Sequence, residues 1–171
     1  VINLKKTFSL RSSDNKHDIN VVLWEPDNDP KAVVQINHGM LEFIDRYDRL
    51  AEYLCGKGIA VAGHDMLGHG ASVLSKDEWG YIADDKNPEK YLIKDVGILR
   101  KHIRGIYPSI PFFMLGHSMG SFVLRAYLSI YADSVSGKDG ISGALIAGTG
   151  FESPAMTKLG VFVTNAFKSL R

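Results

Sequence analysis

Residues 112–120 read FFMLGHSMG and contain the pattern Gly-x-Ser-x-Gly, which runs from Gly116 to Gly120. Residues 111–115 form a short apolar run that predicts a buried strand, and residues 119–131 have the apolar spacing of a helix. A serine between a strand and a helix in this pattern lies on a strained turn that exposes its hydroxyl above the sheet. We therefore expect Ser118 to be a catalytic nucleophile. The alternative is a tight turn in which Ser118 only caps the helix.

The two glycines of this pattern have a steric purpose, because side chains at positions 116 and 120 would collide where the strand passes close to the helix. His117 belongs to the same turn, and we expect its ring to point away from the Ser118 hydroxyl. On the helix that follows, the apolar spacing predicts an inward face made of Phe122, Val123, Ala126, Tyr127 and Ile130.

Strands and helices alternate along the chain on both sides of this turn. Residues 32–37 and 59–63 are apolar runs typical of strands covered on both faces. Residues 47–55 repeat apolar side chains at helical spacing. Residues 92–106 do the same, and their helix is expected to start at Asn87-Pro88. Residues 141–147 predict one more strand. This alternation predicts an α/β fold with a doubly wound, mostly parallel sheet, and residues 1–25 predict two strands at its antiparallel edge.

Acyl transfer also needs donors for the oxyanion that develops in the transition state. The backbone amide of Met119, directly after the nucleophile, is one candidate. His38-Gly39-Met40 follows the strand expected at residues 32–37, so it lies at the carboxyl edge where ligands bind in such sheets. Gly39 allows the backbone to approach a substrate, and the amide of Met40 is the second candidate. The alternative is that His38 and Gly39 form only a turn.

Four motifs then resemble, in order and spacing, the monoacylglycerol lipase and lysophospholipase family of α/β-hydrolases. They are residues 38–42, 46–47, 65–72 and 116–120, and the resemblance covers residues 30–150. It implies an α/β-hydrolase fold and a serine carboxylic ester hydrolase that acts on a single-chain lipid through an acyl-enzyme on Ser118. It implies an oxyanion hole made by Met40 and Met119, with Gly116, His117, Gly120, His38 and Gly39 as supporting residues. Gly68-His69-Gly70 is then a structural loop, and Met66 departs from the polar residue common in relatives.

The usual triad on this fold has its histidine after the serine. All six histidines of this chain precede Ser118 or lie next to it on the amino-terminal side, at positions 17, 38, 64, 69, 102 and 117. A serine hydroxyl needs an adjacent base to become nucleophilic at neutral pH. We therefore expect the chain to be an amino-terminal portion that is inactive alone, with the triad acid and histidine beyond residue 171.

Residues 1–150 are expected to form the amino-terminal part of the hydrolase core, and residues 151–171 the start of a cap or lid. The tail carries an apolar stripe at helical spacing that is flanked by basic residues. Transient contact of the cap with a membrane surface and ordinary packing of the stripe on the core both fit this pattern. The stripe consists of Leu159, Phe162, Val163, Ala166, Phe167 and Leu170.

Composition excludes several other classes. A net charge of +1 over 171 residues gives no basic field for nucleic-acid binding, and no apolar run reaches the length of a membrane span. Cys55 is the only cysteine, which suits a reducing compartment, so we expect a cytoplasmic protein. The spacing of His64, Asp65 and His69 matches no established metal site. We expect neither metal nor cofactor, and we expect Asp95 to be a structural partner of the loops at the sheet end.

Other chemistries use the same serine turn, so a peptidase, a thioesterase and an acyltransferase remain alternatives to a lipid esterase. A non-catalytic binding or scaffold protein on a degenerate hydrolase fold is an alternative of a different class. It predicts that the protein does not turn over short p-nitrophenyl esters.

Overall fold

The computed structural model describes residues 4–82, 86–137 and 140–151. Six strands form one sheet in the order β1-β2-β4-β3-β5-β6. The two amino-terminal strands pair antiparallel to each other, and β2 pairs antiparallel to β4, whereas β3, β4, β5 and β6 run parallel. The strands are β1 (Leu4–Arg11), β2 (Asp18–Glu25), β3 (Ala32–Asn37), β4 (Ile59–His64), β5 (Phe112–His117) and β6 (Gly143–Ala147).

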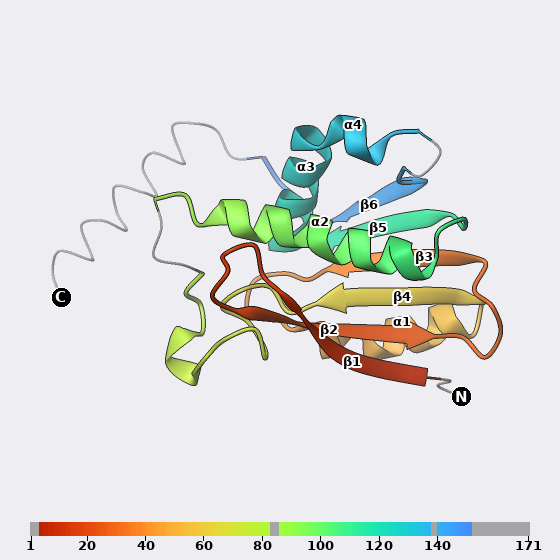
Figure 1. Cartoon of the computed structure of the whole chain (residues 1–171), viewed down its shortest axis with the longest axis horizontal. Coiled ribbons are helices and arrows are strands. Elements are labelled where there is room, and N and C mark those ends of the chain that lie inside the picture. The colour runs from red at the N-terminus through yellow and green to blue at the C-terminus, as the bar shows by residue number, and fades with distance from the viewer. Residues whose placement is uncertain (1–3, 83–85, 138–139, 152–171) are drawn as a thin grey trace, which may run out of the picture.

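Helices cover both faces of this sheet. Figure 1 shows α2 crossing in front of the sheet and α1 lying behind it. The helices are α1 (Asp48–Cys55), α2 (Glu89–Ile106), α3 (Met119–Ile130) and α4 (Ala132–Val135), with short 3-10 helices η1 (Ile44–Tyr47) and η2 (Lys76–Glu78). This is the doubly wound α/β arrangement that the alternating pattern predicted, with the antiparallel strands at one edge.

Alternate residues of β2 divide the core into two layers. Val21 and Leu23 pack with the apolar faces of α2 and α3, whereas Val22 and Trp24 pack with Ala51 of α1 and its neighbours. Side chains of a strand point alternately to opposite faces, so a strand that is apolar throughout must be covered on both sides. The continuous apolar runs in the sequence are explained by this double coverage.

Two details of the helices differ from expectation. On α3, Phe122 is 48% exposed and Ile130 is 62% exposed, so the expected inward face was wrong at these two positions. The buried face is rotated toward Leu124 and includes the polar Ser121, whose hydroxyl donates to the carbonyl of Ser118. A polar residue can therefore lie inside when its hydrogen bond is made locally, which a hydrophobic periodicity does not register. The helix α2 begins at Glu89, with Pro88 as its N-cap residue, one residue later than expected.

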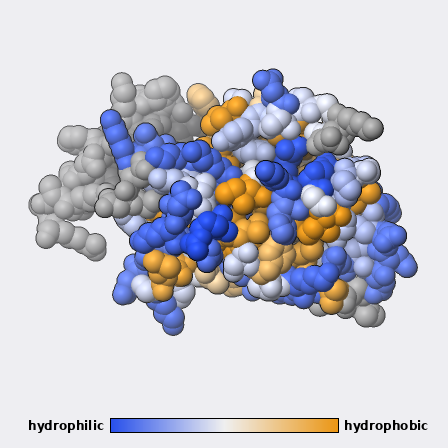
Figure 2. Space-filling view, viewed as in Figure 1, coloured by the Kyte–Doolittle hydropathy of each residue, from blue (hydrophilic) through white to orange (hydrophobic). Residues whose placement is uncertain are grey.

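Among the described residues β6 is the last strand of the sheet, and four of its five residues are exposed. Leu145 is 51% exposed and Ile146 is 36% exposed, although both are strongly apolar. Elsewhere on the face seen in Figure 2, hydrophilic and hydrophobic residues are interspersed. The expected cap segment, residues 151–171, lies outside the described residues except for Phe151.

Candidate active site

Ser118 lies between the last residue of β5 and the first residue of α3. Its backbone angles are φ 49° and ψ −119°, a left-handed conformation that a residue with a Cβ rarely adopts. Hydrogen bonds hold it on both sides: its N–H donates to the carbonyl of Ala147, and its carbonyl accepts the N–H of Ser121 at 2.9 Å. Such strain costs about 1–3 kcal/mol and persists only where the surroundings over-determine it.

The flanking glycines have no room for a side chain. A Cβ at Gly116 would lie 2.6 Å from the carbonyl oxygen of Gly120, and a Cβ at Gly120 would lie 2.1 Å from the carbonyl oxygen of Asn37. Both obstacles are backbone atoms, which cannot rotate away. These glycines therefore allow β3, β5 and α3 to approach closely at the position of Ser118.

The loop after β3 reaches the same place. A Cβ at Gly39 would lie 3.1 Å from the Cβ of Ser118 and 3.2 Å from Nδ1 of His117, so this backbone lies directly against the serine. Met40 follows, and among the residues that the structure describes none accepts a hydrogen bond from its N–H. Met119 is the first residue of α3, and amides of the first turn have no partner within their own helix. Two backbone donors thus flank Ser118.

His38 begins this loop, and its side chain is fully buried. Its Nε2 accepts the N–H of Met66 at 2.9 Å, so the ring proton is on Nδ1, which donates to the carbonyl of Gly39 at 2.7 Å. Burial lowers the pKa of His38 and keeps the imidazole neutral. The ring of His69 meets that of His38 edge-on, with centroids 5.3 Å apart. Both side chains are therefore built into the loop structure.

Glu42 is a residue of the site that sequence reasoning missed. Its carboxylate accepts hydrogen bonds from the Gly39 N–H at 3.2 Å and the Tyr47 O–H at 2.9 Å, and it lies 3.1 Å from Nδ1 of His117. Burial opposes its ionisation, but these hydrogen bonds and the nearby positive charges lower the pKa of Glu42 below its usual value. The motif at residues 38–42 contained this residue, but only the fold brings it to His117.

Two hollows lie beside Glu42, and one of them borders the serine turn through His117. One, of about 270 Å³, is lined by Glu42, Arg46, Tyr47 and His117. The other, of about 380 Å³, is mainly apolar and is lined by Leu41, Glu42, Phe43, Gly68, His69, Gly70, Trp79 and Gly80. Both lie at the carboxyl ends of the parallel strands, where ligands bind in α/β sheets.

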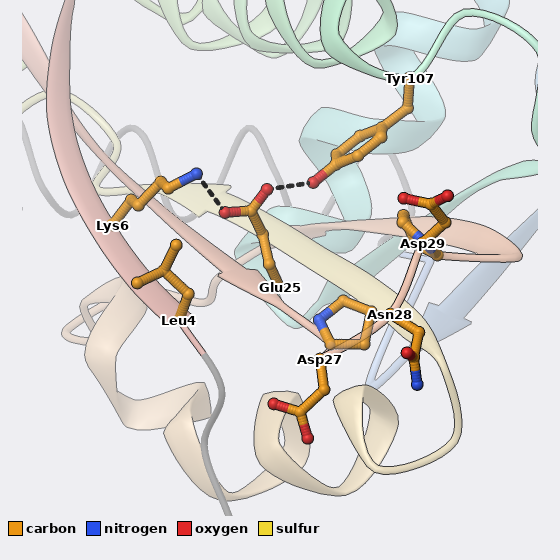
Figure 3. Close-up of a pocket in the computed structure, with 9 residues that line it drawn as sticks. Leu4, Lys6, Glu25, Asp27, Asn28, Asp29 and Tyr107 are labelled. Carbon is orange, nitrogen blue, oxygen red and sulfur yellow. Dashed lines mark hydrogen bonds and ion pairs between the residues drawn. The ribbon is translucent and has the colours of Figure 1, made fainter.

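A hollow at the opposite end of the sheet is different in character. Its volume is about 470 Å³, and Figure 3 shows Lys6 and Tyr107 both bound to Glu25 within it. The Tyr107 hydroxyl donates to Glu25 at 2.6 Å, and the ammonium of Lys6 lies 2.5 Å from the other carboxylate oxygen. These contacts connect β1, β2 and the end of α2, so we assign a structural role to the residues that line this hollow.

Of the residues considered as metal ligands, Asp65 and His69 make hydrogen bonds within the protein. Asp65 accepts the backbone N–H groups of Ile44 and Ala71 and the side-chain amide of Asn20. In the described parts of the chain, no group of three or more His, Cys, Asp or Glu side chains could hold a metal ion. Asp95 accepts the Ser12 hydroxyl and the Ser13 N–H, each at 2.7 Å, which confirms its role as a structural partner of a loop.

A general base for Ser118 is not found among the described residues. Its hydroxyl has no hydrogen-bond partner there, and Nδ1 of the neighbouring His117 is directed to Glu42.

None of the described helices is long and apolar enough to cross a membrane.

Known proteins similar to this chain were compared with it. The family model described as serine aminopeptidase, S33 (Hydrolase_4) matches residues 28–171. A monoglyceride lipase homolog of Monkeypox virus is 39% identical over 110 residues, which are 58% of this chain and 34% of the relative. A monoacylglycerol lipase of Mycolicibacterium smegmatis is 31% identical over 139 residues, which are 73% of this chain and 46% of the relative.

Among solved structures, a thermostable carboxyl esterase from Bacillus coagulans in complex with glycerol has a TM-score of 0.81 and 29% sequence identity. The match covers 96% of this chain and 51% of the esterase. The chain therefore spans between about a third and a half of the length of these relatives.

Proposed function

Because the chain belongs to the serine aminopeptidase S33 family of α/β-hydrolases, we propose that it carries the nucleophile and oxyanion hole of a serine carboxylic ester hydrolase. The observation that carries this proposal is the strained backbone of Ser118, at φ 49°, with the Gly39 backbone packed against it. A strained serine between β5 and α3 is the arrangement that exposes a nucleophile at the top of such a sheet.

In this mechanism Ser118 loses its proton to a base and attacks the ester carbonyl. The amides of Met40 and Met119 donate to the oxyanion of the tetrahedral intermediate. The protonated base gives the proton to the alcohol as it leaves, and an acyl-enzyme remains. Water then loses a proton to the same base, attacks the acyl carbonyl, and releases the acid as Ser118 regains its proton. No histidine follows Ser118 in these 171 residues, so we propose that the triad histidine, and with it the triad acid, are not part of this sequence.

For the substrate we propose a single-chain lipid ester, such as a monoacylglycerol or a lysophospholipid. Support comes from the names of the relatives, which are monoglyceride or monoacylglycerol lipases, and from the apolar hollow beside Glu42. The family description names a peptidase, so amide hydrolysis is the alternative chemistry. A cytoplasmic location, and contact of the cap with a membrane surface, stay predictions.

The test is labelling by a fluorophosphonate probe, measured on protein that extends beyond Arg171 and includes a triad histidine. We expect rapid labelling of this protein and none of Ser118→Ala, because the probe reacts only with an activated serine. Ser109→Ala is the control: this exposed serine precedes β5, at the opposite end of that strand from Ser118, and the variant should label normally. Undiminished labelling of Ser118→Ala would contradict the proposal.

A second measurement separates the ester and peptide chemistries. We expect monoacylglycerol to be hydrolysed with a higher kcat/KM than an aminoacyl amide, and the 171-residue chain alone to turn over neither. Preference for the amide would transfer the assignment to the peptidase alternative.

A further inference from the structure

We propose that Glu42 is a positioning residue of the oxyanion hole: its carboxylate clamps Gly39 so that the Met40 amide stays directed at the oxyanion. This inference rests on the proposed function. The Glu42 side chain is 15% exposed; it accepts hydrogen bonds from the Gly39 N–H and the Tyr47 O–H, and it lies 3.1 Å from Nδ1 of His117.

The first step of the argument concerns the two polar groups of Gly39. Its N–H is bound by Glu42 and its carbonyl by Nδ1 of His38, so both sides of this residue are held. A glycine otherwise has the widest choice of backbone angles, and the two hydrogen bonds remove that freedom. The loop is therefore held by side-chain contacts at the residue where its own backbone is least restrained.

The second step concerns the peptide unit that joins Gly39 to Met40. In a planar trans peptide the C=O and the N–H point in opposite directions. Because the Gly39 carbonyl points at the buried ring of His38, the Met40 N–H points to the other side, away from the core. Rotation of Gly39 would turn this donor away, so the bond from Glu42 to the Gly39 N–H helps to set the direction of the amide at Met40.

The third step concerns His117, which precedes the nucleophile. The same carboxylate lies 3.1 Å from Nδ1 of His117, so Glu42 joins the loop after β3 to the end of β5. The fit is close: a Cβ at Gly39 would lie 3.1 Å from Ser118, 3.2 Å from His117 and 3.3 Å from Glu42. Glu42 thus fixes the distance between the loop after β3 and the turn at Ser118, the two backbone segments that bear the proposed oxyanion donors.

A carboxylate near a developing oxyanion repels it, so any benefit from Glu42 must come from its geometry and not from its charge. This distinction makes the proposal testable by two substitutions. Glu42→Gln removes the charge but keeps an oxygen that can accept the Gly39 N–H. Glu42→Asp keeps the charge but withdraws the carboxylate by one methylene group, so it no longer reaches that N–H.

The experiment uses ester-hydrolysing protein that extends beyond Arg171. We expect Glu42→Asp and Glu42→Ala to lower kcat about 10- to 100-fold with KM changed less than about threefold, since loss of a whole oxyanion donor costs about 10²- to 10³-fold. Glu42→Gln should stay within about fivefold of the wild type. Glu52→Ala, at an exposed glutamate of α1, is the matched control and should keep its kcat.

The opposite order of the two kcat values overturns the proposal: if Glu42→Asp is active and Glu42→Gln is not, the charge of Glu42 matters and its hydrogen bond to Gly39 does not. Full kcat in Glu42→Asp and Glu42→Ala also overturns it. Thermal unfolding of each variant excludes loss of fold, and if Glu42→Ala does not fold, the Asp and Gln pair decides alone. Ser118→Ala separates this from the proposed function, because failure of that function appears as labelling that persists without Ser118.

Discussion

His64 should make the protein unstable in mild acid. This residue ends β4, is completely buried, and neither ring nitrogen has a hydrogen-bond partner among the described residues. Burial, with a smaller contribution from His38, lowers its pKa to about 3, whereas a histidine in an unfolded chain titrates near 6.5. The folded protein therefore holds this ring neutral over a range in which the unfolded chain would protonate it.

The sign and size follow from proton linkage. The pKa of His64 is depressed in the folded state, so its neutral form leaves stability complete above about pH 6.5. Below that value the unfolded chain binds a proton that the folded chain does not, and the free energy of unfolding falls by about 1.4 kcal/mol per pH unit. Between pH 7.5 and pH 5 this amounts to about 2 kcal/mol. His38, whose pKa is also lowered by burial, contributes with the same sign.

Urea unfolding followed by tryptophan fluorescence at several values between pH 7.5 and pH 5 measures this effect. His64→Leu provides an apolar side chain of similar size for a site without polar partners, and we expect it to lose about 2 kcal/mol less than the wild type across this range. His102→Gln, at an exposed histidine of α2, is the control and should follow the wild type. Parallel curves for the wild type and His64→Leu would refute the reasoning.

Three further predictions concern stability and reactivity. Gly120→Ala should destabilise the fold by about 3 kcal/mol or more in urea unfolding, because its Cβ would meet the Asn37 carbonyl at 2.1 Å; a change below 1 kcal/mol would contradict this. Trp24→Phe should cost about 2 kcal/mol, since it removes part of a buried ring and the part-buried bond from the indole N–H to Asp48; an unchanged melting temperature in calorimetry would contradict this. Burial raises the pKa of Cys55 to about 11, so its thiol should react with a disulfide reagent only as fast as the protein unfolds; rapid reaction in native buffer would count against it.

The order of elements could be predicted from the sequence because each strand and helix has a local signal. The strand at Ala32–Asn37 was expected with the same bounds, and the positions of β4, β5 and α2 agree within one or two residues. Apolar runs and helical spacing are properties of residues close together in the sequence, so they can be recognised without knowledge of the fold.

The order of strands in the sheet could not be predicted in the same way. The sheet places β4 between β2 and β3, and β3 between β4 and β5, although these strands do not follow that order in the chain. Strand order depends on where crossovers return, which no local pattern records. The exposed side of α3 was misjudged for a related reason: several of its faces are apolar, and only packing against β5 and α2 selects one.

The contact between Glu42 and His117 could not be predicted for the same reason. Residues 38–42 and residues 116–120 lie far apart in the sequence, and their meeting depends on the parallel pairing of β3 with β5. In that pairing Asn37 is opposite Gly116, so the next residues along each strand bring His38 and Gly39 to His117 and Ser118. A shift of one residue in this register would turn the side chains to opposite faces and separate Glu42 from His117. The proposed oxyanion side of the site therefore depends on strand register among the described residues. Substitutions at Glu42 test that side of the proposal separately from the base.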